Sequence, residues 1–84
     1  MQERLWPSRS ESAVSSLRQA ISEVKGDFVV EWIELGVLGY FVLFRSGTLV
    51  HREPHIDVAV LENGPDPDAI RALVRKVKAV FGQT

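Results

Sequence analysis

The chain has 84 residues, of which 45% are hydrophobic and 25% charged, a composition typical of one folded domain and not of a disordered chain. It contains no cysteine, which excludes a disulfide framework, a thiol nucleophile and a zinc site built on thiolates. The formal net charge of −1 provides no general attraction to nucleic acid or to anionic lipid.

No segment of the sequence is expected to enter a membrane. The longest apolar run, Val37 to Phe44, is far shorter than the roughly 20 residues that a bilayer requires. The residues that follow Met1 show no apolar stretch of the kind found in secretory leaders. Together with the lack of cysteine, these patterns predict a cytoplasmic protein.

The first part of the chain predicts an arm and then a helix. Residues 1–9 are expected to form an N-terminal arm, and residues 10–82 a single domain. Ser8 and Glu11 have the spacing of a capping box, and Gly26 is a suitable stop. Between the capping box and Gly26, apolar residues recur at helical spacing and would share one face: Ala13, Val14, Leu17, Ala20, Ile21 and Val24.

From Asp27 the apolar period changes to two, which predicts an antiparallel meander. Two-residue loops are expected at Leu35-Gly36 and at Ser46-Gly47. Because Pro54 cannot donate to a central ladder, it marks either a kink in a long edge strand or a turn into a fourth strand, and we favour the turn.

Asp66 followed by Pro67 predicts the start of a second long helix, which Gly82 would end. Its apolar stripe would comprise Ile70, Leu73, Val74, Val77 and Phe81. The expected fold is therefore α+β: an N-terminal helix, an antiparallel meander of three to four strands and a C-terminal helix, with both helices packed on one sheet face.

The two faces of the predicted sheet are both apolar. With these loops, the covered core face would carry Phe28, Val30, Trp32, Gly39, Phe41, Leu43 and Val50. The opposite face would carry Val29, Ile33, Leu38, Val42, Phe44 and Leu49, with Tyr40 and His51 as polar anchors.

Two helices with one stripe each can cover only one face, so something else must cover the other. Leu5 and Trp6 of the arm could contribute, or one helix could cross over. We expect a second protein, most simply another copy of the chain, to bind there. The predicted function is thus a non-enzymatic interaction module of adaptor, chaperone or inhibitor type, with no cofactor.

Three other functions have some support in the sequence. His51, Glu53 and His55 could bind a divalent metal in an unbroken strand, although their spacing matches no specific metal motif. We expect Glu31 and Tyr40 to be opposed across two strands, with His51 and Glu53 beside them. These four side chains could perform acid–base chemistry in a pocket that excludes water.

The third alternative is nucleic-acid contact by the C-terminal helix, whose outward face carries Arg71, Arg75 and Lys78. Nucleic-acid-binding modules carry a larger excess of basic over acidic residues than this chain does. A solvated helix face is therefore the favoured explanation of this stripe.

Overall fold

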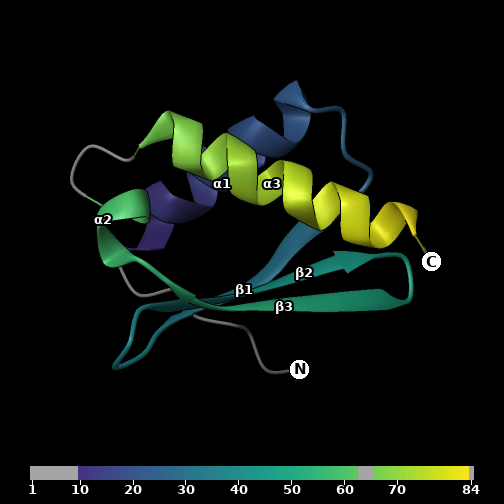
Figure 1. The fold of residues 1–84 in the computed structure, drawn as a ribbon. Helices are drawn as coiled ribbons and strands as arrows, with labels where there is room; N and C mark the ends of the chain where they lie inside the picture. Colours follow the sequence, from purple (N-terminus) through teal and green to yellow (C-terminus); the bar gives the residue numbers. More distant parts are fainter. Residues whose placement is uncertain (1–9, 63–65, 84) are drawn as a thin grey trace.

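The computed structural model describes residues 10–62 and 66–83, and the predicted arm lies outside them. The described residues form an α+β fold, as predicted, in which a three-stranded antiparallel meander follows one helix and precedes another. The elements are α1 (Ser10–Glu23), β1 (Val29–Leu35), β2 (Tyr40–Ser46), β3 (Leu49–Ile56), α2 (Val58–Leu61) and α3 (Pro67–Gly82). Both long helices lie on the same side of the sheet (Figure 1).

Helix α1 buries the face that its apolar spacing predicts. Ala13, Val14, Leu17, Ala20 and Ile21 are all buried in the core. The helix ends with Lys25 in the left-handed conformation, with φ of 56°, and the Gly26 amide donates to the Ile21 carbonyl over 3.0 Å. This arrangement is that of a Schellman motif, in which the left-handed position belongs to Lys25 and not to the glycine that follows.

Helix α3 starts at the predicted cap. The Asp66 carboxylate accepts hydrogen bonds from the amides of Asp68 and Ala69, at 3.1 and 3.3 Å, and Pro67 occupies the first turn. These bonds satisfy amide groups that have no partner within the helix. Ile70, Val74 and Val77 are buried, and Leu73 and Phe81 pack at the margin of the core.

The sheet order is β1-β2-β3, and β1 contains a bulge. Val30 pairs with Phe44, but Trp32 pairs with Leu43, so Glu31 is an extra residue in β1. Because the extra residue reverses the alternation of side chains, Val30 and Ile33 point to the same face.

The core lies between the sheet and the two helices. Phe44 is fully buried at its centre, 5.9 Å from Phe28 in an edge-on contact, and Phe28 in turn lies 5.4 Å from Phe81. Tyr40, Val42 and Ile33 point to the same side of the sheet and are at most 1% exposed.

Strand β3 continues through Pro54 as an edge strand, so the predicted fourth strand is wrong. His55 adopts a left-handed conformation with φ of 62°, and the chain then turns into the short helix α2. The Asp57 carboxylate caps α2 by accepting from the Ala59 amide over 2.9 Å.

Candidate interaction surface

The register of the strands separates the sheet into a helix-covered inner face and an outer face turned away from α1 and α3. No helix among the described residues lies over the outer face (Figure 1). The side chains of the outer face are Val29, Trp32, Glu34, Phe41, Leu43, Arg45, Val50 and Arg52.

A shallow hollow of about 180 Å³ lies on the outer face, with Trp32, Phe41 and Leu43 among its lining residues. The Arg52 guanidinium stacks over the Phe41 ring, 4.7 Å from its centroid, and the Trp32 indole N–H donates to Glu34 over 3.4 Å. The hollow thus combines two aromatic rings and a leucine with one cation and one anion. Such a site can hold an apolar side chain and orient it by charge.

The far end of the outer face, beyond the hollow, carries two further exposed apolar residues. Val29 and Val50 are 54% and 56% exposed there, on either side of Arg45. Arg45 forms an ion pair of 2.5 Å with Glu31. This end of the outer face therefore presents two exposed valines beside one ion pair.

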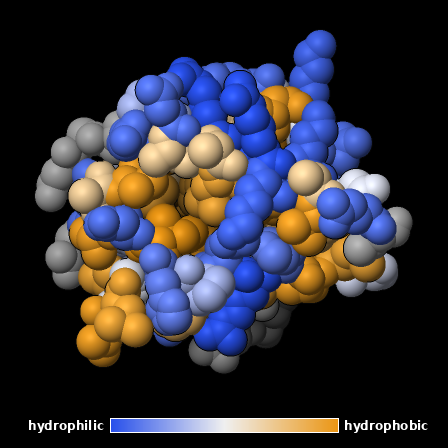
Figure 2. Space-filling view, in the orientation of Figure 1, coloured by the Kyte–Doolittle hydropathy of each residue, from blue (hydrophilic) through white to orange (hydrophobic). Residues whose placement is uncertain are grey.

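The β1–β2 tip, residues 36–39, adds a second exposed apolar feature. Val37 is fully exposed and Leu38 is 71% exposed. Figure 2 shows this tip as an apolar protrusion at the lower left of the molecule. Exposed branched side chains at a loop tip are suited to contacts with another protein.

Half of the eight residues predicted for the interface lie in the core, so that assignment of the faces is wrong. Ile33, Tyr40, Val42 and Phe44 are buried beneath the helices. His51 pairs with Phe44 and shares its inner face. Only three of the predicted interface residues are exposed: Val29, Leu38 and Leu49.

The residues predicted for the core face show the converse error. Trp32, Phe41, Leu43 and Val50 lie on the outer face, and Phe28 and Val30 are buried as expected. The sheet thus has two apolar faces, as the sequence predicts, but the predicted inner and outer faces are exchanged over most of their length.

On the inner face, a polar cluster joins β3 to α3. The Glu53 carboxylate, in a residue only 7% exposed, lies 2.6 Å from His51 Nε2 and 3.2 Å from Lys76 Nζ. Burial by itself raises the pKa of Glu53, but the hydrogen bonds and charges of His51 and Lys76 outweigh it, so that the net pKa lies below the ordinary value of 4.5. The carboxylate is thereby held in its charged form.

This depressed pKa predicts a pH-dependent stability. A carboxyl group with a lower pKa in the folded state stabilises the fold above its unfolded pKa of about 4.5, and the contribution disappears as the pH falls through the folded pKa. We expect Glu53→Gln to lower the free energy of unfolding by about 1 kcal/mol at pH 5.5, since Lys76 is largely exposed and screened. Urea unfolding of both proteins between pH 5.5 and 2.5 should show this difference shrinking below pH 4.5. A difference that stays constant over this range would contradict the assignment.

The structure does not assemble the predicted metal triad. His51 and Glu53 face α3, whereas the His55 ring lies 5.7 Å from the ring of Phe41, an outer-face residue. The left-handed backbone at His55 breaks the alternation that would have aligned the three side chains. Within residues 10–62 and 66–83, no group of three or more histidine or acidic side chains is placed to bind a metal ion.

The predicted acid–base group is likewise separated. Tyr40 pairs with Leu35 and not with Glu31, whose carboxylate instead binds Arg45. His51 and Glu53 remain neighbours, and each contributes to the contact with α3 described above.

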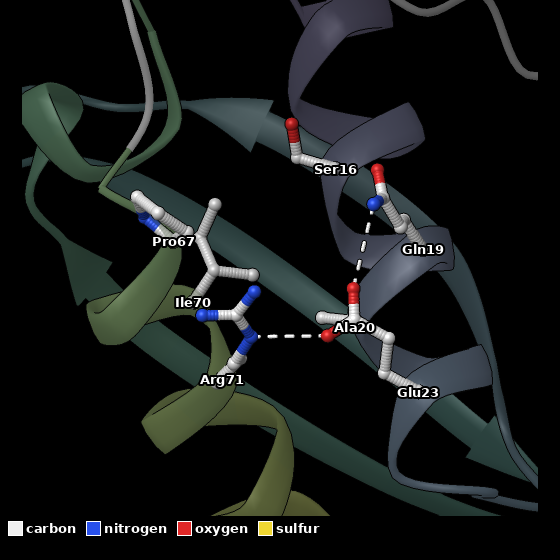
Figure 3. A pocket seen from close by; sticks show the side chains of 7 residues that line it. All are labelled: Ser16, Gln19, Ala20, Glu23, Pro67, Ile70 and Arg71. Carbon is white, nitrogen blue, oxygen red and sulfur yellow. Dashed lines mark hydrogen bonds and ion pairs between the residues drawn. The ribbon is translucent and has the colours of Figure 1, made fainter.

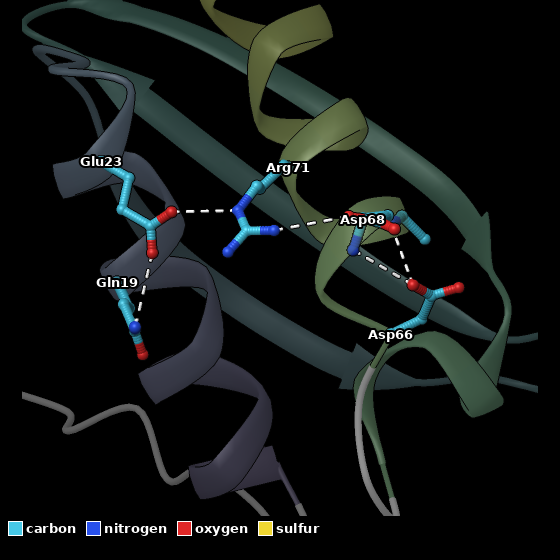
Figure 4. Close-up of polar contacts among 6 residues, drawn as sticks. Gln19, Glu23, Asp66, Asp68 and Arg71 are labelled. Carbon is cyan, nitrogen blue, oxygen red and sulfur yellow. Dashed lines mark hydrogen bonds and ion pairs between the residues drawn. The ribbon is translucent and has the colours of Figure 1, made fainter.

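Helices α1 and α3 form a small groove of about 150 Å³, lined by side chains from both (Figure 3). Arg71 bridges it, with Nε 3.0 Å from Glu23 and Nη1 3.4 Å from Asp68 (Figure 4). Lys78 donates to the Val24 carbonyl over 2.7 Å. Two of the three cations of the predicted nucleic-acid stripe are therefore engaged within the chain, and Arg75 is the third.

Comparisons with protein-family models, with curated proteins and with solved structures found no match to this chain. Among the described residues, no helix is long and apolar enough to span a bilayer.

Proposed function

We propose that this protein is a small non-enzymatic protein–protein interaction module that binds its partner through the outer face of its sheet. The observation that carries the proposal is the apolar, partly exposed surface of Trp32, Phe41 and Leu43 on the side of the sheet that neither long helix covers (Figure 1). An antiparallel sheet with one wet face ordinarily carries polar side chains there.

The residue types on the outer face favour a protein partner. Aromatic residues and arginine are enriched in protein interfaces, and lysine is depleted. The outer face carries Trp32, Phe41, Arg45 and Arg52 and contains no lysine. The aromatic rings would provide most of the buried area, while the charges would select the orientation of the partner.

The charges of the molecule argue for a protein and not for nucleic acid. Arg45 on the outer face is paired with Glu31, and Arg71 on α3 is paired with Glu23. With a net charge of −1, the chain offers no general attraction to a phosphate backbone.

The test is Leu43→Asp, which places a charge at the centre of the outer face. With a second copy of the chain as the simplest partner, we expect the wild type to self-associate and the variant to be a folded monomer, because a buried unpaired carboxylate would cost several kcal/mol at the interface. Light scattering would report the mass and circular dichroism the fold.

The matched control is Val58→Asp. Val58 is 38% exposed on α2, and α2 packs against α1 and α3. This substitution makes the same change of an exposed apolar side chain to a carboxylate, and it should leave association unchanged. A Leu43→Asp protein that associates as strongly as the wild type would contradict the proposal.

A further inference from the structure

The two free charges of the outer face lie on opposite edges of the sheet. Glu34 belongs to β1 and Arg52 to β3, and both side chains are exposed. Glu34 accepts a hydrogen bond from Trp32, and Arg52 stacks on Phe41, but neither forms an ion pair with another residue of the described ranges. The outer face is therefore acidic along one edge and basic along the other.

Two identical sheets can pack face to face with aligned strands in two symmetric ways. If the twofold axis runs across the strands, β1 lies over the partner's β1 and β3 over the partner's β3. Like charges then meet, since Arg52 is the charged outer-face residue of β3. If the axis runs along the strands, β1 lies over the partner's β3, and opposite charges meet.

We propose that the occupant of the outer face is a second copy of this chain, packed with the twofold axis along β2, so that Glu34 faces the partner's Arg52. This inference rests on the proposed function and adds the identity and orientation of the partner. Phe41 and Leu43, on the central strand, would each lie near the axis and contact their own counterparts.

The positions of the two charges along the strands and the separation of packed sheets are compatible with this pairing. Glu34 is level with Phe41, and Arg52 is level with Leu43, so the two charges are offset by two residues along the strands, or roughly 7 Å. Packed sheets lie about 10 Å apart. An extended arginine and a glutamate together span this separation, and each dimer would contain two such pairs.

The experiment is a charge exchange. In this arrangement Glu34→Arg brings two arginines together and Arg52→Glu brings two glutamates together, so each single variant should weaken dimerisation at least tenfold. The double variant E34R/R52E restores both pairs and the net charge, and it should dimerise like the wild type. Mixing the two single variants should also restore dimers, because the mixed dimer again pairs opposite charges.

Dissociation constants from analytical ultracentrifugation would measure these effects, with circular dichroism to verify that each variant is folded. Arg75→Glu, an exposed position on α3, changes the charge equally and should have no effect. Single variants that dimerise like the wild type, together with a monomeric Leu43→Asp, would overturn the orientation while leaving the proposed function in place.

The identity of the occupant is tested separately. A wild type that stays monomeric at millimolar concentration would overturn the inference of a second copy. If the full chain then dimerises only after Leu5→Ser and Trp6→Ser are introduced, the outer face would be assigned to the N-terminal segment instead.

Discussion

Phe44→Asp is expected to abolish the folded state, whereas Leu43→Asp, one residue earlier in the same strand, should preserve it. Phe44 is fully buried and contacts Phe28 edge-on, so the substitution removes a core ring and places a carboxylate among apolar side chains. The loss of a buried phenylalanine alone costs about 3–5 kcal/mol, and an unpaired charge adds to it. A domain of this size has a total stability of the same order.

Far-ultraviolet circular dichroism and urea unfolding of the two variants would decide this prediction. Leu43 is the matched control because it lies on the same strand and takes the same new side chain, but points to the outer face. A folded, soluble Phe44→Asp protein would mean that the two faces are assigned the wrong way round in the structure.

Gly39→Ala is expected to lose several kcal/mol of stability, much more than Gly47→Ala. Gly39 has φ of 133°, where side chains are strongly disfavoured, and a Cβ there would collide with the Ile56 carbonyl oxygen of β3. Its own carbonyl accepts from the Gly36 amide over 2.9 Å and closes the β1–β2 tip. The substitution would therefore disturb the tip and the pairing of β2 with β3 together.

Gly47 provides the comparison, since it also has positive φ, at 62°, but has open space around it. Its replacement by alanine should cost only about 1 kcal/mol, the usual penalty of a left-handed residue. Urea unfolding curves of the two variants would give both values. Equal losses would show that the contact with Ile56 does not matter.

The helices and the order of elements could be predicted from the sequence because their signals are local. Asp66 and Pro67 specify the start of α3 within two residues, and the apolar spacing of α1 identifies its buried face. The fourth strand could not be excluded in this way, because residues 56–61 are apolar enough for either a strand or a helical turn.

The candidate surface was harder to predict because it depends on which face the helices cover. Both sheet faces are apolar, so composition does not choose between them. Glu53 can lie on the buried inner face because it is compensated by Lys76, which is 23 positions away in the sequence. That contact exists only once α3 has packed on the sheet.

The bulge at Glu31 added a second error. Strict alternation groups Val30 with Trp32, whereas the extra residue groups Val30 with Ile33 and sends Trp32 to the outer face. The β1–β2 connection also differs from the predicted two-residue loop, since β1 extends through Leu35 and residues 36–39 form the tip. No residue pattern in β1 marks the position of the bulge.

Each edge strand of the sheet, β1 and β3, has an interrupted row of backbone hydrogen-bonding groups. These interruptions limit how large an assembly can become. On β1 the extra residue Glu31 interrupts the row of backbone groups, and on β3 the row is broken by Pro54, which lacks an amide proton, and by the left-handed His55. Both interruptions oppose the addition of a further strand from another chain. Growth by strand addition into fibres is thereby disfavoured, so the proposed association across the outer face would end with two subunits.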